Sequence, residues 1–157
     1  MHEVGLLDEK QLKDFALSLS KDIEGGEVIF LRGELGSGKT TFVKGFATGF
    51  GIDEKLVRSP TFTIVNEYPG ATLELVHIDL YRLRSIEEVI ELAIEDIIDE
   101  TTVTVVEWPE LCEKLLKNNI EIFFYHYDET HREIKLKLLD DRTYSSTMNW
   151  LKSHVQE

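Results

Sequence analysis

The stretch EVIFLRGELGSGKTTFVKG occupies residues 27–45, and it decides the fold. It opens with a short run that favours a β-strand and closes with apolar side chains at helical spacing. Between the two lies GELGSGKT, where Gly33, Gly38, Lys39 and Thr40 satisfy the pattern of a phosphate-binding loop. A strand, a glycine-rich loop and a helix in this order predict a site for a nucleoside triphosphate.

The chemistry of such a loop follows from its backbone. Its N–H groups and the N-terminus of the next helix point toward phosphate oxygens, and glycine lets the chain come close because it has no Cβ atom. Lys39 is expected to reach the β- and γ-phosphates, and the Thr40 hydroxyl to ligate Mg²⁺. The predicted nucleotide contacts along the loop are Glu34, Leu35, Gly36, Ser37, Gly38, Lys39 and Thr40. The alternative interpretation is an incidental glycine turn before a helix.

Two carboxylates and one threonine are candidates for the rest of the site. Asp79 ends the apolar run LVHID and Glu107 ends VTVVE, so both are expected at the carboxyl edge of the sheet, where a second Mg²⁺ contact normally lies. Either carboxylate can instead be a helix cap or a solvated strand end. Thr61, in the segment SPTFT, stands where nucleotide switches place a threonine that senses the γ-phosphate. An ordinary connecting loop would need no such role.

The remaining elements surround this unit. Apolar spacing predicts helices over residues 8–23 and 40–50, a helix that opens at Ser85 with a capping box, and a short final helix over residues 144–155. Strands are expected at residues 61–68, 73–83, 103–108, 120–127 and 132–139. This pattern predicts a three-layer α/β/α P-loop NTPase fold with a mixed, partly antiparallel sheet. A single domain over residues 1–157 is expected for a chain of this length.

Composition narrows the function and the location. The 30 acidic and 17 basic residues give a formal charge of −13, which disfavours tight, unaided binding to nucleic acid, although acidity also simply favours solubility. No apolar run is long enough for a membrane span, and MHEVGLLDEK lacks the pattern of a signal peptide, so a cytoplasmic protein is expected. The single Cys112 is interpreted as a packing residue, and the five His residues show no metal-binding spacing.

Four motifs in order, GELGSGKTTFVKG, SPTFTIVNEY, HIDLYRL and VEWPE, resemble those of the TsaE (YjeE) family of small bacterial P-loop ATPases. The match runs over about residues 25–110. Proteins of this family are required for the threonylcarbamoyladenosine modification of tRNA. The resemblance implies an ATPase that works with TsaB and TsaD, of which TsaD transfers the threonylcarbamoyl group to the adenosine beside the anticodon. The acidic surface is consistent with such a protein, because it would meet tRNA only indirectly.

Carried across residue by residue, the resemblance divides the work among five side chains. Lys39 would bind phosphate, and Thr40 together with Glu107 would hold Mg²⁺. Thr41 would contact the α-phosphate or the surroundings of the metal ion, and Asp79 would assist catalysis. The implied activity is slow, Mg²⁺-dependent ATP hydrolysis that the partner proteins raise or enable.

The resemblance is looser at the edges of the site. Trp108 would lie beside it, and Arg132 together with residues near the chain start would border the adenine. The chain departs from the family at Glu34, where Asp is more frequent, and at Ala93, where Gly is common. The second departure is expected to alter the end of the helix that contains it.

Other classes of protein share the glycine-rich loop. A GTPase would need an Asn-Lys-x-Asp segment to read guanine, and the sequence has none. A small-molecule kinase is the stronger rival, but it is expected to bring an arginine-rich lid, and only 6 Arg are scattered along the chain. A third alternative is a non-hydrolytic switch that binds a nucleotide and a partner without turnover.

Overall fold

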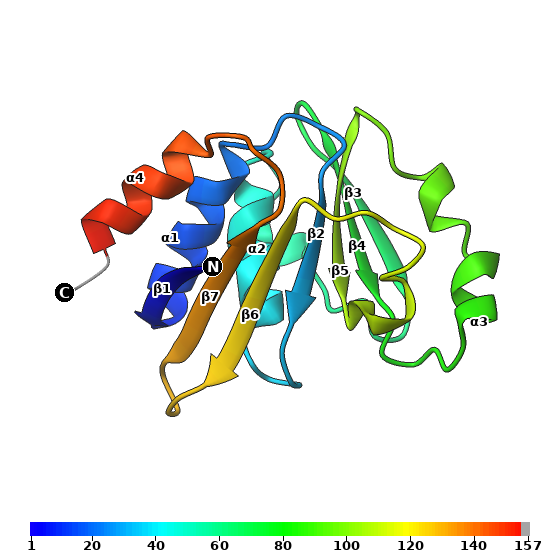
Figure 1. Cartoon of the computed structure of the whole chain (residues 1–157), viewed down its shortest axis with the longest axis horizontal. Coiled ribbons are helices and arrows are strands. Elements are labelled where there is room, and N and C mark those ends of the chain that lie inside the picture. The colour runs from blue at the N-terminus through cyan, green and yellow to red at the C-terminus, as the bar shows by residue number, and fades with distance from the viewer. Residues whose placement is uncertain (155–157) are drawn as a thin grey trace.

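The structure, a computed structural model, describes residues 1–154 and contains a seven-stranded sheet (Figure 1). The strands are β1 (His2–Leu7), β2 (Val28–Arg32), β3 (Val65–Pro69), β4 (Glu74–Asp79), β5 (Thr102–Glu107), β6 (Ile120–His126) and β7 (Arg132–Leu138). Their order across the sheet is β1-β7-β6-β2-β5-β4-β3. The neighbours of β2 and β5 are parallel to them, whereas β1, β3 and β7 pair antiparallel with their neighbours. The predicted mixed, partly antiparallel sheet is confirmed.

The parallel centre of the sheet aligns the strand ends that matter for function. Nearly every residue of β2 and β5 is buried, as is typical of parallel strands covered on both faces. Glu107, the last residue of β5, pairs in register with Leu31 of β2 on one side and with Asp79 of β4 on the other. The carboxyl ends of these three strands therefore lie side by side, at the edge where open α/β sheets bind their ligands.

Helices cover both faces of the sheet, which confirms the three-layer prediction. On one face lie α1 (Glu9–Ser20), α2 (Lys39–Thr48) and α4 (Ser145–His154), and on the other lies α3 (Ile86–Glu91) (Figure 1). The layer around α3 is thin, because α3 has only 6 residues and its neighbours are short 3₁₀ helices at Ile94–Asp96 and Pro109–Leu111. The thicker layer carries the helix that follows the glycine-rich loop.

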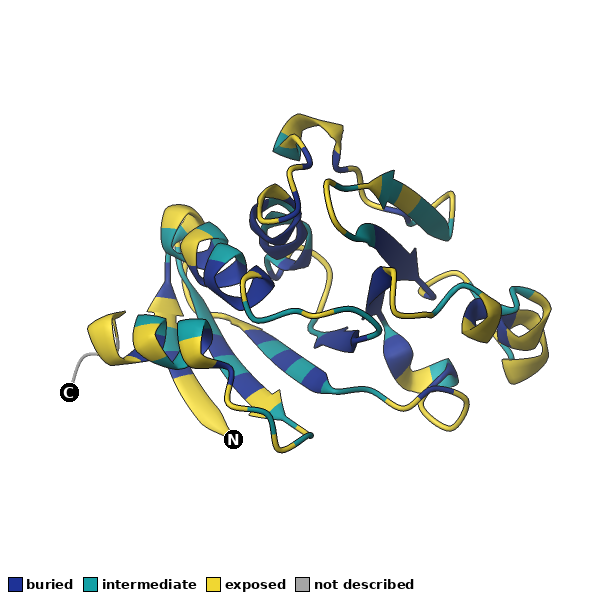
Figure 2. Cartoon of the chain, turned by 90° about the horizontal axis from the view of Figure 1, so that it is seen from above, coloured by how far each residue is buried: buried dark blue, intermediate teal, exposed yellow. Residues whose placement is uncertain are grey.

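An aromatic cluster fixes that helix against the sheet. The ring of Phe42 lies 6.2 Å from Phe15 of α1, 5.5 Å from Phe46 and 6.0 Å from Phe124 of β6, measured between ring centroids. Figure 2 shows the buried residues of these elements facing inward, and all four rings are buried. Each such aromatic pair adds about 0.5–1.5 kcal/mol beyond the area that it buries. The packing therefore holds the first turn of α2 in a defined place above the sheet.

Residues 2–7 form the edge strand β1, which the sequence analysis did not predict. Val4 and Leu7 are buried in the core, but the register of β1 with β7 shifts between Glu3 and Gly5. This irregularity interrupts the alternation of apolar and polar residues by which a strand is recognised in a sequence. The strand matters because it leads the chain directly into Asp8, the N-cap of α1.

Predicted boundaries are wrong on either side of the β3–β4 pair. The strand predicted at residues 61–68 begins only at Val65, because Ile64 adopts a φ of 69° that no strand allows. The strand predicted at residues 73–83 ends at Asp79, whose side chain accepts a hydrogen bond from Tyr81 N and turns the chain. The helices predicted over residues 8–23, 40–50 and 144–155 are confirmed with slightly different ends, and Val155 lies outside the described residues.

Ala93 lies just beyond the end of α3, before the 3₁₀ helix at Ile94–Asp96. It adopts φ 51° and ψ 46°, in the left-handed region. That conformation costs a non-glycine residue about 1–2 kcal/mol. A glycine at this position would adopt the same conformation without strain.

The surroundings of Cys112 agree with the sequence analysis. Cys112 is fully buried, and burial raises the pKa of its thiol to about 12, so the thiolate that a reactive cysteine needs is absent at neutral pH. This supports its interpretation as a packing residue. Within residues 1–154, no helix has both the length and the apolar character needed to cross a membrane.

Candidate nucleotide-binding site

The glycine-rich loop turns the chain from the end of β2 into the first turn of α2. Gly36 and Gly38 have φ angles of 74° and 105°, which favour glycine, and Gly38 is the N-cap of α2 without a capping side chain. Gly33 lies so close to β6 that a Cβ atom there would come within 2.9 Å of the carbonyl oxygen of Phe124. The glycines thus shape the loop and leave the N–H groups at the start of α2 without a side-chain cap, as in anion sites.

Lys39 is the first residue of α2, and its side chain is 4% exposed. Its Nζ donates a hydrogen bond to the carbonyl oxygen of Gly33 at 2.5 Å and lies 3.8 Å from Glu107 Oε1. It also lies 4.2 Å from the ring centroid of Trp108. Burial lowers the pKa of Lys39, and the Glu107 carboxylate opposes this effect. A buried ammonium group is therefore held directly beside the loop.

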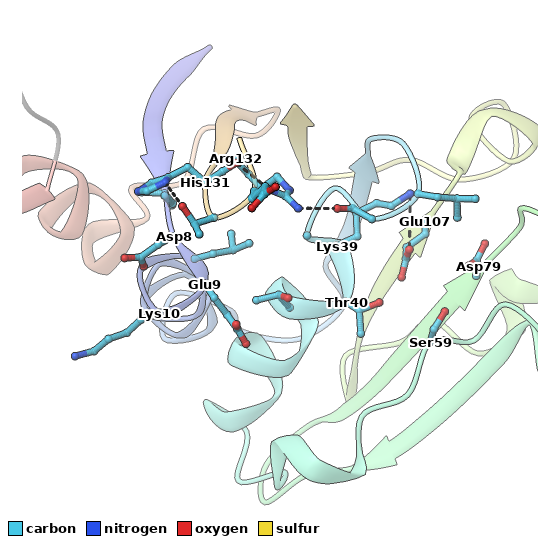
Figure 3. Close-up of a pocket in the computed structure, with 18 of the residues that line it drawn as sticks. Asp8, Glu9, Lys10, Lys39, Thr40, Ser59, Asp79, Glu107, His131 and Arg132 are labelled. Carbon is cyan, nitrogen blue, oxygen red and sulfur yellow. Dashed lines mark hydrogen bonds and ion pairs between the residues drawn. The ribbon is translucent and has the colours of Figure 1, made fainter. Parts of the chain in front are cut away.

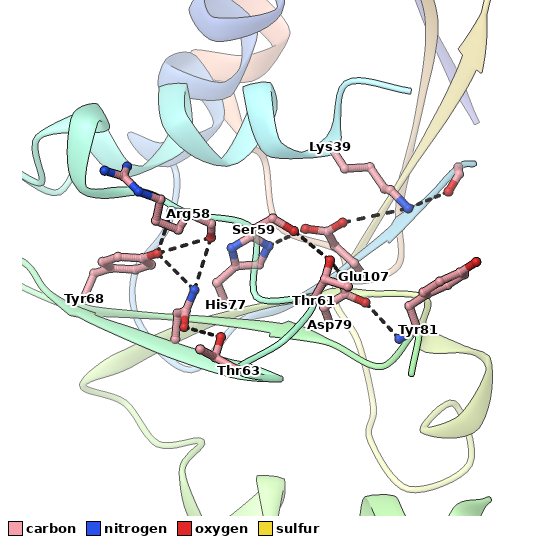
Figure 4. Close-up of polar contacts among 12 residues, drawn as sticks. Lys39, Arg58, Ser59, Thr61, Thr63, Tyr68, His77, Asp79, Tyr81 and Glu107 are labelled. Atoms are coloured by element: carbon pink, nitrogen blue, oxygen red, sulfur yellow. Dashed lines mark hydrogen bonds and ion pairs between the residues drawn. The ribbon is translucent and has the colours of Figure 1, made fainter. Parts of the chain in front are cut away.

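Asp79 and Glu107 lie next to each other at the ends of β4 and β5, and both are buried (Figure 4). Asp79 Oδ1 accepts a hydrogen bond from Tyr81 N at 2.8 Å, and Oδ2 accepts one from Thr61 Oγ1 at 3.1 Å. Burial raises the pKa of Asp79 above its usual value, against the opposing effect of the Tyr81 bond. Two buried carboxylates on neighbouring strand ends favour a cation between them.

Thr61 ties the segment before β3 to the site. Its hydroxyl bonds to Asp79, and Ser59 Oγ lies 2.8 Å from Thr61 Oγ1. One residue earlier, Arg58 N donates to the Tyr68 hydroxyl of β3 at 3.0 Å, which fixes the base of the segment. The structure thus places Thr61 beside the strand-end carboxylates, as the sequence analysis proposed. Its function as a sensor of the γ-phosphate stays a prediction.

These groups form one end of a cavity of about 800 Å³ (Figure 3). The other end is built by the start of α1 and by the turn between β6 and β7, with Leu7, Asp8, Glu9, Lys10, Leu12, Glu129, Thr130, His131 and Arg132. Arg132 fastens that turn to the loop, because its Nη2 donates to the carbonyl oxygen of Gly36 at 3.1 Å. A cavity of this size is typical of sites for nucleotide-sized ligands.

Most of the predicted site residues line this cavity. They are Leu35, Gly36, Gly38, Lys39, Thr40, Thr41, Thr61, Asp79, Glu107 and Arg132. Three predicted residues do not line it. Glu34 faces a separate hollow beside Phe123, Ser37 is buried within the loop, and Trp108 touches Lys39 without lining the cavity. Any contact from Glu34 or Ser37 to a ligand is therefore expected through the backbone.

The sequence analysis missed His77, which it weighed only as a metal ligand. The side chain of His77 is fully buried, and its Nε2 lies 2.5 Å from Glu107 Oε2. A signal was present, because His77 and Asp79 are two residues apart on one strand and thus share a face. The start of α1 and the turn at residues 128–131 carry no such signal, since only the fold brings them to the cavity.

The donor chemistry of the cavity fits a Mg²⁺–nucleotide complex. The Thr40 hydroxyl and the carboxylates of Asp79 and Glu107 supply the hard oxygen atoms that Mg²⁺ prefers. Mg²⁺ is usually held by one or two carboxylates together with substrate phosphates, which is the set that this site can provide. Ser37 Oγ is buried in the loop and has no hydrogen-bond partner among the described residues. The loop therefore keeps one hydroxyl group that is free to form a hydrogen bond.

A central parallel strand that leads through a glycine-rich loop into a helix, with Lys39 at the helix start, defines the chain as a P-loop NTPase fold. The crystal structure of YdiB from Bacillus subtilis is similar to it, with a TM-score of 0.67 and 31% identity. That comparison covers 94% of this chain and 91% of YdiB. The likeness extends over nearly all of both molecules.

Within that class, the family can be stated. The family model described as "Threonylcarbamoyl adenosine biosynthesis protein TsaE" matches residues 6–134, and the chain belongs to this family. A protein named "tRNA threonylcarbamoyladenosine biosynthesis protein TsaE" in Bacillus subtilis is 40% identical over 74% of this chain and 73% of its own length. Proteins of the same name in Aquifex aeolicus and Nostoc are 39% and 34% identical, each over 87% of this chain and over 96% and 85% of their own lengths. The resemblance inferred from four motifs is confirmed.

Proposed function

We propose that this protein binds ATP and hydrolyses it with Mg²⁺ as a component of the machinery that makes threonylcarbamoyladenosine beside the anticodon of tRNA. It acts in the cytoplasm with TsaB and TsaD and does not perform the transfer itself. Membership of the TsaE family supports the pathway. One observation supports the chemistry most strongly: Lys39 at the start of α2 meets Asp79 and Glu107 of the strand ends in a single cavity.

Phosphate binding falls to the loop and to Lys39. In the structure Lys39 Nζ bonds to a loop carbonyl, and a weak neutral acceptor of this kind is easily exchanged for a phosphate oxygen. The uncapped start of α2 adds backbone N–H groups and the positive end of the helix dipole. The adenine end is then expected among the residues at the start of α1 and near Arg132.

Hydrolysis requires the strand-end carboxylates. Thr40 and Glu107 would hold Mg²⁺, and bound Mg²⁺ supplies positive charge that stabilises the transferring phosphoryl group. Asp79, whose pKa is raised by burial, lines the same cavity and would orient the attacking water. Thr61 is bonded to Asp79 and would report the presence of the γ-phosphate to the segment before β3. Free of its partners, the protein is expected to turn over slowly.

The net charge of the chain supports an indirect relation to tRNA. A formal charge of −13 opposes an RNA backbone, and a nucleotide-driven component held by partner proteins does not need to grip RNA itself. We therefore assign recognition of the tRNA and transfer of the threonylcarbamoyl group to the partners. The ATP cycle of this protein would drive a conformational or release step in the complex.

Phosphate release tests this proposal. The protein is assayed with Mg²⁺ and either ATP or GTP, alone and together with TsaB and TsaD. We expect slow release from ATP that rises when both partners are present, and little from GTP. If the protein binds ATP tightly but releases no phosphate, either alone or with its partners, the interpretation as an ATPase is wrong and a non-hydrolytic switch takes its place. Transfer of the phosphoryl group to a small molecule, in place of water, would favour a kinase.

A further inference from the structure

His77 is a polar residue at a place where packing alone would favour an apolar one. It lies in the middle of β4, paired in register with Val105 of β5, and its side chain is fully buried. Its Nδ1 has no hydrogen-bond partner among the described residues. A buried polar atom without a partner costs stability, so a contribution to folding does not explain this residue. Its other nitrogen, Nε2, forms one hydrogen bond within residues 1–154, and the partner is Glu107 Oε2.

The geometry divides the two oxygens of Glu107 between two partners. Oε2 lies 2.5 Å from His77 Nε2, whereas Oε1 lies 3.8 Å from Lys39 Nζ (Figure 4). Because the Glu107 oxygens serve as acceptors, we assign the donor role in this bond to His77 Nε2. The bond to His77 is thus short and direct, while the separation from Lys39 is longer than a hydrogen bond.

We propose that His77 is a positioning residue that anchors Glu107 to β4 and keeps its carboxylate from collapsing onto Lys39. The proposal rests on the function proposed above, because it concerns the same two side chains. Lys39 and Glu107 are both almost fully buried, where attraction between opposite charges is strong. Without the bond from His77, the carboxylate would be free to rotate toward Lys39 and turn the 3.8 Å ion pair into a closer, hydrogen-bonded pair. Lys39 would then have to break that pair before it could bind phosphate.

The bond has a second consequence for Glu107 itself. A carboxylate that is fixed through one oxygen presents its other oxygen in a constant direction, here toward Lys39 and the cavity. Residues that orient a metal-binding carboxylate through such a bond typically change affinity or activity about 10- to 100-fold when they are lost. His77 would therefore keep the ammonium group of Lys39 available for phosphate. It would also fix the direction of the Glu107 oxygen that is proposed to bind Mg²⁺.

Substitutions at His77 test the proposal through ATP binding, without any need for turnover. His77→Leu removes the donor, and His77→Gln restores an N–H donor at the same number of bonds from Cβ. Thr104→Val is the matched control, because Thr104 is a fully buried polar residue of β5 whose hydroxyl has no partner among the described residues. Each variant is titrated with ATP in EDTA by calorimetry, and its folding is checked by thermal unfolding.

We expect His77→Leu to weaken ATP binding about tenfold with unchanged stoichiometry, and we expect His77→Gln and Thr104→Val to stay within about twofold of wild type. In a Glu107→Gln background, His77→Leu should have almost no effect, because no carboxylate is left to pair with Lys39. If His77→Leu lowers the affinity for ATP equally in the wild-type and the Glu107→Gln protein, His77 has only a structural role and the proposal is overturned. Failure of the wild-type protein to bind ATP would instead refute the proposed function.

Nuclear magnetic resonance of wild-type protein tests the same bond even if His77→Leu does not fold. We expect a proton on His77 Nε2 with a strongly downfield resonance that moves upfield in Glu107→Gln. A proton found only on His77 Nδ1 would overturn the proposal. Neither result depends on hydrolysis or on partner proteins.

Discussion

Replacement of Glu107 by Gln separates nucleotide binding from turnover. The substitution keeps the size of the side chain and an oxygen that can accept from His77 Nε2, but it removes the negative charge 3.8 Å from Lys39 Nζ. In the absence of Mg²⁺ that charge both competes with phosphate for Lys39 and repels the phosphates. ATP binding in EDTA should therefore become tighter, while Mg²⁺-dependent hydrolysis should be lost.

The size of the effect follows from the burial and separation of the pair. Two unit charges at 3.8 Å attract each other by about 4 kcal/mol at an effective dielectric constant of 20. Both side chains lose hydration in the folded protein, and the structure relaxes around a neutral Gln, so only part of this energy reaches the binding equilibrium. We expect about 1.4 kcal/mol, which corresponds to a tenfold tighter dissociation constant for ATP. Loss of the Mg²⁺ contact should lower the turnover rate about 100-fold.

Calorimetric titration and phosphate release measure the two halves of this prediction. Glu113→Gln is the matched control, because the Glu113 side chain is partly exposed and pairs with Arg32 rather than with Lys39. It should leave both affinity and turnover within about twofold of wild type. Weaker ATP binding by Glu107→Gln in EDTA, or undiminished hydrolysis with Mg²⁺, would refute the assigned position of Glu107 between Lys39 and the metal ion.

Three further substitutions probe the site and its scaffold. Folding raises the pKa of Asp79 above 3.8. The carboxyl group therefore binds its proton more tightly in the folded state than in the unfolded state, and the stability of the protein falls as the pH rises above 3.8. Asp79→Asn should thus raise Tm by about 2–4 °C at pH 7, with the gain lost below pH 3.8, in thermal melts followed by circular dichroism. Gly33→Ala should weaken ATP binding more than about tenfold by calorimetry, because its Cβ would come within 2.9 Å of a backbone oxygen of Phe124. Ala93→Gly should raise Tm by about 2–4 °C in the same melts, since it relieves a φ of 51°, and an unchanged Tm would argue against strain there.

The sequence predicted the parts of the site that depend on local geometry. The loop is contiguous, and its glycines alone fix the backbone that approaches phosphate, so Gly36 and Gly38 could be recognised without a structure. Asp79 and Glu107 were found from a general rule, since each ends an apolar run and parallel strands bring their carboxyl ends to one edge. The mixed sheet with helices on both faces followed from the order of the elements.

What the sequence did not predict depends on contacts between distant segments. The bond from His77 to Glu107 requires the register of β4 against β5, which no local pattern reveals. Residues near the chain start and Arg132 were expected at the cavity only from the family resemblance, because no local pattern reveals that β1 pairs with β7 and brings Asp8 and His131 there. β1 itself escaped prediction, since the irregularity at Gly5 disturbs its alternation. The strand predicted at residues 61–68 is shorter in the structure because Ile64 adopts a positive φ, which is rare for a β-branched residue.

Reconstitution of the tRNA modification tests the central claim most directly. Threonylcarbamoyladenosine is measured in tRNA after reaction with TsaB, TsaD and a donor of the threonylcarbamoyl group, with this protein present, absent or replaced by Lys39→Ala. Lys39 is buried beside the loop and the strand-end carboxylates, so its loss should abolish ATP binding and reduce modification over multiple turnovers to the level without the protein. Modification that proceeds equally well without the protein, or with Lys39→Ala in its place, would contradict the account.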